Sequence, residues 1–159
     1  MFLQGKVYHV YNRGNRKSVV FPKESDKWYF LKKAYFLAEK DQCNVDIVAY
    51  CLMDNHYHMV LKQLSDTSIS KFMQRLMTSF SQHINAKYLY VGHTFQGRFN
   101  SKLVKNNLYR FSLFRYLRDN PVKSGYVSLP SRYGWMNVPE GTDLQGDRPP
   151  TPSWPPTPS

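Results

Sequence analysis

Two histidines, separated by one residue, are the side chains in this chain best suited to bind a metal ion. His56 and His58 flank Tyr57 within residues 51–61, CLMDNHYHMVL. Alternate residues of a β-strand point to one face, so two imidazoles roughly 7 Å apart along a strand can converge on one ion. Apolar residues alternate with them, as expected for a half-buried strand. Packed or surface histidines give the same pattern, so this pair alone does not establish a metal site.

A tyrosine and an asparagine further along the chain form a second candidate pair. Tyr116 and Asn120 lie in FSLFRYLRDNP, residues 111–121, and the segment from about Leu108 has helical periodicity. We expect Pro121 to end this helix, because the residue before a proline is driven out of the helical region. Positions i, i+4 and i+8 form one stripe, here Ser112, Tyr116 and Asn120. A separate apolar stripe is expected to face the core and contains Tyr109, Leu113 and Leu117.

This helix offers a phenol nucleophile one turn before an amide oxygen that can bind a metal ion. The simpler interpretation is a half-buried tyrosine followed by an asparagine at the end of a helix. The two interpretations remain open on these residues alone.

Strands and helices that would position both pairs can be read from the hydrophobic periodicity. Strands are expected at residues 6–12, 45–53 and 56–61, with Asp54 and Asn55 forming a turn, and a glycine-interrupted strand or pair of strands at 95–104. Helices are expected at 23–40, at 68–88 with Ser68 as N-cap, and from about 108. This order predicts an α+β fold of the ferredoxin-like or RRM-like type, in which an antiparallel sheet carries helices on one face. The last helix, which carries the nucleophile, is an addition to that plan.

Composition indicates a polyanionic partner. The 159 residues suffice for one domain, and 22 basic against 11 acidic residues give a net charge of +11. The 12 tyrosines and 10 phenylalanines are interleaved with lysine and arginine, as in proteins that stack bases and pair phosphates of single-stranded nucleic acid. Solubility alone, or binding to acidic proteins or membranes, is the alternative explanation for the charge.

The ends of the chain and its cysteines indicate the cellular setting. No run of about 18 apolar residues is present and the N-terminus lacks a signal-peptide core, so we expect a cytoplasmic protein with no membrane partner. Cys43 and Cys51 are expected to pack in the core without forming a disulfide. Residues 1–140 should form the domain, and the proline-rich residues 141–159 a disordered tail. The alternative is that the tail docks, through Trp154, into the protein's own groove for nucleic acid.

Five short motifs resemble one family, in that family's order. They are YHVYNRG at residues 8–14, AYCLMDNHYH at 49–58, GHTFQGRF at 92–99, RYLRDNPVK at 115–123 and YGW at 133–135. Together they resemble the single-tyrosine HUH transposases of the insertion-sequence-200 type, and most of all the REP-associated tyrosine transposases. HUH denotes two histidines around a bulky hydrophobic residue. The chain departs from the family at Asp54, where proline is usual, and at Arg118-Asp119.

The resemblance implies a metal-dependent endonuclease and strand transferase acting on single-stranded DNA folded as a hairpin. It implies that Tyr116 is the nucleophile, forming a 5′-phosphotyrosine, and that His56, His58 and Asn120 bind the metal ion. Neutral nitrogen and oxygen ligands suit Mg²⁺ or Mn²⁺. The protein would be a monomer or a homodimer.

Basic residues near these motifs are candidates for contacts with DNA phosphates, although each could equally be a solvated surface charge. They are Arg13, Arg16, Lys17, Arg98, Lys102, Lys105, Arg115, Arg118 and Lys123. His9 and His93 are expected to be structural or to face DNA rather than to bind metal. Two other functions remain open: a non-catalytic module that binds single-stranded nucleic acid, and a nuclease that uses metal-bound water.

Overall fold

The structure is a computed structural model that describes residues 2–139. The tail predicted at residues 141–159 lies outside them. The elements, in chain order, are β1 (Val7–Arg13), η1 (Asn15–Lys17), α1 (Glu24–Ala38), β2 (Val45–Leu52), β3 (His56–Gln63), α2 (Ser68–Tyr88), β4 (Asn100–Leu103), α3 (Asn107–Lys123), η2 (Pro130–Arg132) and β5 (Met136–Asn137).

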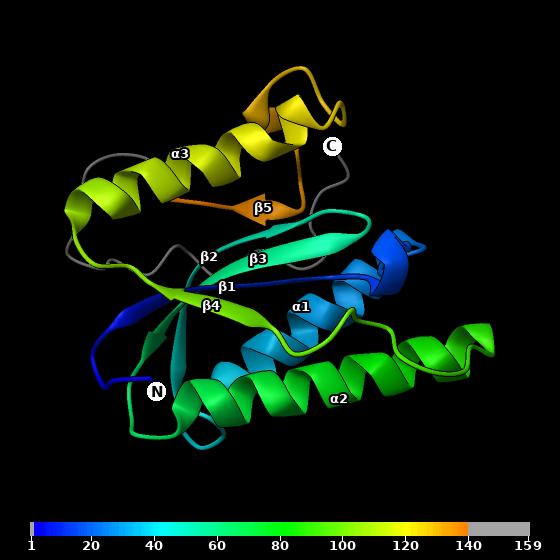
Figure 1. Ribbon diagram of the computed structural model, residues 1–159, viewed down its shortest axis with the longest axis horizontal. Coiled ribbons are helices and arrows are strands. Elements are labelled where there is room, and N and C mark those ends of the chain that lie inside the picture. Colours follow the sequence, from blue (N-terminus) through cyan, green and yellow to red (C-terminus); the bar gives the residue numbers. More distant parts are fainter. Residues whose placement is uncertain (1, 140–159) are drawn as a thin grey trace.

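The five strands form one antiparallel sheet in the order β4-β1-β3-β2-β5. Helices α1 and α2 cover one face of this sheet, whereas α3 crosses the opposite face (Figure 1). The predicted α+β plan, an antiparallel sheet with two helices on one face and an added C-terminal helix, is therefore confirmed. The histidine strand β3 lies at its centre.

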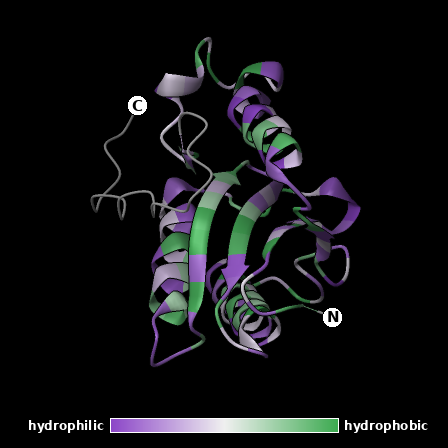
Figure 2. Cartoon of the chain, turned by 90° about the vertical axis from the view of Figure 1, so that its left-hand side faces the viewer, coloured by the Kyte–Doolittle hydropathy of each residue, from purple (hydrophilic) through white to green (hydrophobic). Residues whose placement is uncertain are grey.

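Alternation along β3 separates the core from the site. Tyr57 is fully buried beneath α1 and α2, with its ring 5.1 Å from that of Phe30 and its hydroxyl donating to the Met77 sulfur at 3.2 Å. Its neighbours His56 and His58 consequently point to the face covered by α3. The strands at the centre of the sheet are largely hydrophobic, and the helices carry mixed surfaces (Figure 2). Cys43 and Cys51 are free thiols buried in this core, as predicted.

The prediction that Pro121 ends the last helix is wrong. Helix α3 continues to Lys123 with Pro121 inside it. The proline ring has no N–H for the carbonyl of Leu117, but both residues are buried, and their packing holds the last turn. The helix begins after Asn106, whose side chain accepts a hydrogen bond from the Tyr109 N–H at 2.8 Å.

Helix α2 has the predicted bounds but not the predicted cap. Ser68 is its first helical residue, and Thr67 at the N-cap position makes no hydrogen bond through its side chain. Instead the Gln63 side chain, fully buried at the end of β3, accepts a hydrogen bond from the Ile69 N–H at 3.3 Å. A residue from a neighbouring strand thus satisfies the helix end.

The expected strand at residues 95–104 is shorter in the structure. Only Asn100–Leu103 pair with β1 as β4, and Phe95 makes an isolated bridge to Gly14. Strand β5, which the sequence analysis did not predict, adds two residues to the edge beside β2. Among residues 2–139, no helix has the length and apolar character needed to cross a membrane.

Candidate active site

A braced turn precedes the histidine strand. The Asp54 carbonyl accepts hydrogen bonds from the Val20 and Phe21 N–H groups at 2.8 and 3.0 Å, and the Asn55 carbonyl accepts one from Gly14 at 2.9 Å. Gly14 has no room for a side chain, since a Cβ would overlap the Ser18 carbonyl oxygen. These bonds fix the backbone immediately before His56.

The departure from the family pattern at Asp54 has a structural explanation. Its carboxylate lies 3.0 Å from the Lys27 ammonium, which is itself mostly buried. The Lys27 ammonium also lies 5.7 Å from the centre of the Trp135 ring. A salt bridge to α1 therefore holds the turn where a proline would otherwise stiffen it.

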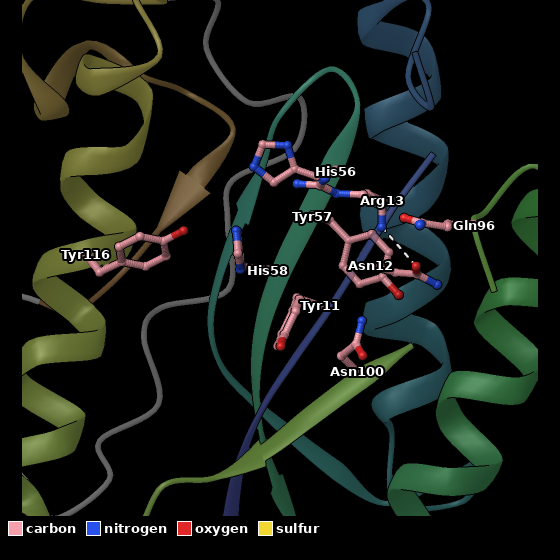
Figure 3. A pocket seen from close by; sticks show the side chains of 9 residues that line it. All are labelled: Tyr11, Asn12, Arg13, His56, Tyr57, His58, Gln96, Asn100 and Tyr116. Carbon is pink, nitrogen blue, oxygen red and sulfur yellow. Dashed lines mark hydrogen bonds between the residues drawn. The ribbon is translucent and has the colours of Figure 1, made fainter. Parts of the chain in front are cut away.

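Strand β3 and helix α3 meet at the histidines. The Tyr116 ring packs edge-on against His58 with 5.7 Å between ring centres, and His58 packs edge-on against His56 at 5.2 Å. In Figure 3 the Tyr116 ring points from α3 towards the sheet, where His58 stands out from β3. The Tyr116 side chain is 48% exposed, so a substrate can reach its hydroxyl.

These three side chains line a cavity of about 310 Å³. Strand β1 contributes Tyr11, Asn12 and Arg13, the segment leading into β4 contributes Gln96, and β4 itself contributes Asn100 (Figure 3). Polar groups from three strands and one helix therefore converge on a space large enough for part of a nucleotide strand.

Each histidine has one ring nitrogen engaged by the protein. His56 Nδ1 lies 2.7 Å from the Asn55 side-chain oxygen, which can only accept, so Nδ1 carries the hydrogen. His58 Nδ1 lies 2.9 Å from His9 Nε2. When His58 Nδ1 donates in that bond, both Nε2 atoms keep a free lone pair for a ligand.

Burial keeps the imidazoles neutral. Burial, with the charges of neighbouring groups, lowers the pKa of His58 to about 3. Burial together with Lys102 lowers the pKa of His9 to about 4, and burial together with Arg13 lowers the pKa of His56. A neutral imidazole is the form that binds metal.

Asn120 lies one helical turn beyond Tyr116 but is not among the residues lining the cavity. Its Oδ1 accepts a 3.3 Å hydrogen bond from Ser124, and its Nδ2 is buried with no hydrogen-bond partner among residues 2–139. Turning the amide would present its oxygen at that unpaired position. No group of three or more His, Cys, Asp or Glu side chains within the described residues could hold a metal ion. The assignment of His56, His58 and Asn120 as metal ligands therefore stays a prediction.

The predicted phosphate-binding residues do not all lie at the cavity. Arg13 lines it, and Lys102 pairs in register with His9 on the adjacent strand. Arg16 and Lys17 are exposed in η1, directly after β1, both with a positive φ, at 55° and 58°. Arg98 lines a different cavity, and Lys105 lies between β4 and α3. The remaining candidates lie on α3: Arg115, Arg118 and Lys123. Arg115 lies 4.0 Å from Asp119.

The sequence analysis did not identify four residues that line the cavity: Tyr11, Asn12, Gln96 and Asn100. It expected His9 to be structural or to face DNA, and the structure places His9 in a hydrogen bond with His58. Alternation in the first strand could have placed His9 and Tyr11 on one face, but not against His58. That contact depends on the pairing of β1 with β3, in which Tyr11 lies opposite His58.

Comparison with known proteins identifies similar sequences and folds. A family model described as "Transposase IS200 like" matches residues 4–120. A solved REP-associated tyrosine transposase bound to a REP hairpin is similar with a TM-score of 0.69 and 20% identity, over 92% of this chain and 89% of that one. A candidate transposase from Deinococcus radiodurans is similar with a TM-score of 0.52 and 14% identity, over 74% of this chain and 92% of that one. No curated protein sequence matches the chain.

Proposed function

The chain belongs to the family of IS200-like transposases, and we propose that it cuts and rejoins single-stranded DNA through Tyr116 with the help of a divalent metal ion. The observation that carries this proposal is the edge-on contact, 5.7 Å between ring centres, of Tyr116 with His58. This contact joins Tyr116, the tyrosine that the family resemblance gives as the nucleophile, to the histidine pair within one chain. A monomer would therefore be sufficient for activity.

The proposed reaction is an in-line displacement at phosphorus. The Tyr116 hydroxyl oxygen forms a bond to the phosphorus and gives up its proton. The bond from phosphorus to the 3′-oxygen breaks, and that oxygen takes a proton to become a free 3′-OH. The phosphotyrosine left on the 5′ end keeps the bond energy that hydrolysis would lose, so a second strand's 3′-OH can later displace Tyr116 and rejoin DNA.

A phenol is a weak nucleophile at neutral pH because its ordinary pKa is near 10. A divalent cation, Mg²⁺ or Mn²⁺, held by His56, His58 and Asn120 would polarise the scissile phosphate and stabilise its developing charge. His9 would act as a positioning residue that accepts the hydrogen bond of His58 and so fixes its ring. Arg13 lines the cavity and is suited to pair with a phosphate oxygen.

The proposed substrate is single-stranded DNA that carries a hairpin. The similar REP-associated transposase is bound to a REP hairpin, and the net charge of +11 suits a polyanion. We propose a cytoplasmic location for this activity.

Covalent capture tests the proposal. The protein is mixed with Mn²⁺ and a hairpin DNA whose single-stranded flanks are labelled, and the products are separated under denaturing conditions. We expect a protein–DNA band that resists denaturation in wild type and is absent in Tyr116→Phe, which keeps the ring and removes the nucleophilic oxygen. Tyr126→Phe, a change of the same type at another exposed tyrosine, should leave the band intact.

Other outcomes distinguish the alternatives. Free fragments without a covalent band would identify water as the nucleophile. Uncut DNA with retained affinity would indicate a binding module. Either result would overturn the role given to Tyr116.

A further inference from the structure

A second cavity, of about 500 Å³, lies on the other side of the segment that leads into β4. Its floor is apolar and comes from α2 and the segment, with Met73, Met77 and Phe95. A polar stripe along α2 forms one rim at helical spacing: Ser70, Gln74 and Thr78. The opposite wall contains Phe99 and Arg98.

The segment at residues 94–100 forms a partition between the two cavities. Gln96 and Asn100 line the cavity with the histidines, whereas Phe95, Gly97 and Phe99 line the second one. Figure 1 shows this segment returning from the end of α2 and running back along that helix to β4.

Three hydrogen bonds fasten the partition to β1 and the loop that follows. The Asn15 N–H donates to the Thr94 carbonyl at 3.1 Å, and the Gln96 N–H donates to the Arg13 carbonyl at 3.0 Å. The Asn12 side-chain amide donates to the Gly97 carbonyl at 3.0 Å, and Asn12 lines both cavities. A wall held in this way is preformed, so a ligand would not have to order it on binding.

We propose that the second cavity binds one nucleobase of the single strand that adjoins the cleavage site. This inference rests on the proposed function, since it needs single-stranded DNA at the neighbouring cavity. A base is flat, with apolar faces and polar edges, and it fits an apolar floor bordered by hydroxyl and amide side chains. Phe99 is part of an aromatic wall, with its ring 6.2 Å from that of Phe2 and nearly parallel to it. Bases stack on such rings.

Charge and continuity favour a nucleotide over an apolar peptide or a second copy of the chain. Arg98 at the rim can pair with the phosphate attached to the base. The two cavities share one wall, the segment at residues 94–100. A DNA strand that leaves the histidine cavity past Gln96 and Asn100 therefore has to turn around this segment alone to reach the second cavity. The base would thereby fix which phosphate lies at Tyr116.

A binding experiment without cleavage tests the inference. Tyr116→Phe protein is titrated with a hairpin DNA carrying thymidine flanks, and then with copies that lack the base at one flank position at a time. Loss of the bound base should weaken binding about tenfold at one position. Gln74→Trp places a large side chain in the second cavity from its exposed rim. It should weaken binding of the intact DNA by a similar factor, and a missing base should then cause no further loss of affinity.

Gln82→Trp provides the matched control, because Gln82 is also exposed on α2 and does not line the second cavity. It should bind like the parent, and melting curves should show all variants folded. Equal binding of every base-free DNA, or a penalty that persists in Gln74→Trp, would overturn the inference. The covalent-capture result is read separately, so failure of Tyr116 as nucleophile and failure of the base site are distinguishable.

Discussion

At the level of single residues, the structure shows how the protein fixes the orientation of the His58 ring. The His58 ring contacts four other rings: His9 at 5.1 Å, His56 at 5.2 Å, Tyr116 at 5.7 Å and Tyr11 at 5.9 Å between ring centres. The contact with His9 is also a hydrogen bond, and the His9 ring stacks on Tyr11 at 4.8 Å. A ring held from several sides loses little freedom when its Nε2 binds an ion.

Removal of the His9 ring should therefore weaken metal binding. We expect His9→Ala to lower Mn²⁺ affinity about tenfold, the smaller end of the range for partners of ligating histidines. Calorimetric titration of the protein with Mn²⁺, without DNA, measures this directly.

Two further variants separate positioning from general damage. His9→Gln retains an acceptor for the His58 hydrogen bond and should recover part of the affinity. His93→Ala, at an exposed histidine outside the site, should leave the affinity unchanged. Wild-type affinity in His9→Ala would contradict the positioning role.

At the level of elements, α1 and α2 are joined through one buried carboxylate. Asp26, at the start of α1, is fully buried and accepts hydrogen bonds from Lys87 at 2.8 Å and His83 at 3.0 Å, near the end of α2. The Tyr88 hydroxyl also donates to it. The His83 ring stacks on Tyr29 of α1, with 3.9 Å between ring centres. These contacts keep both helices on the face of the sheet opposite α3.

Asp26 should make stability depend on pH. Burial by itself would raise the pKa of its carboxyl, but the hydrogen bonds it accepts, first of all from Lys87, lower the pKa below its usual value. The stabilisation is therefore present above about pH 4 and is lost as the pH falls through the lowered pKa of the folded state. At pH 7 we expect Asp26→Asn to reduce the free energy of unfolding by about 3 kcal/mol, measured by urea unfolding.

The difference between wild type and Asp26→Asn should remain constant from pH 7 to about pH 5 and shrink in more acidic solution. Asp41→Asn, at an exposed carboxylate, should have little effect on stability at any of these pH values. A difference that grows as the pH falls would contradict the assigned protonation state.

At the level of the whole molecule, the site lies between the sheet and α3, away from the layer formed by α1 and α2 (Figure 1). Exposed basic residues lie in η1, directly after the end of β1 that carries Arg13, and along α3. DNA would approach from there, with its phosphates spread over these charges, while α1 faces solvent on the opposite side.

The salt dependence of DNA binding should distinguish the basic residues that follow β1 from those on and after α1. Replacing Arg16 and Lys17 together by alanine should reduce the slope of log binding constant against log salt by about 1.4, since each single-strand phosphate contact contributes roughly 0.7. The measurement is fluorescence anisotropy with the hairpin DNA at several NaCl concentrations. Replacing Lys32 and Lys40, which are exposed on and just after α1, removes the same charge and should leave the slope nearly unchanged. Equal slopes for the two double variants would contradict a localised contact, because they would show that only the net charge of the protein affects DNA binding.

The sequence alone determined the features that depend on local periodicity. Alternation placed His56 and His58 on one face of a strand and Tyr57 on the other, and helical spacing put Tyr116 and Asn120 on one stripe and Leu113 and Leu117 in the core. Tertiary structure decided which of these faces meet: Tyr116 against His58, His9 behind His58, and Lys27 on Asp54. It also overrode the local rule at Pro121, where packing retained a turn that the missing N–H weakens. Strand and helix periods follow from backbone geometry within a few residues, whereas each of those contacts joins segments far apart in the chain and exists only once strand pairing and helix docking are in place.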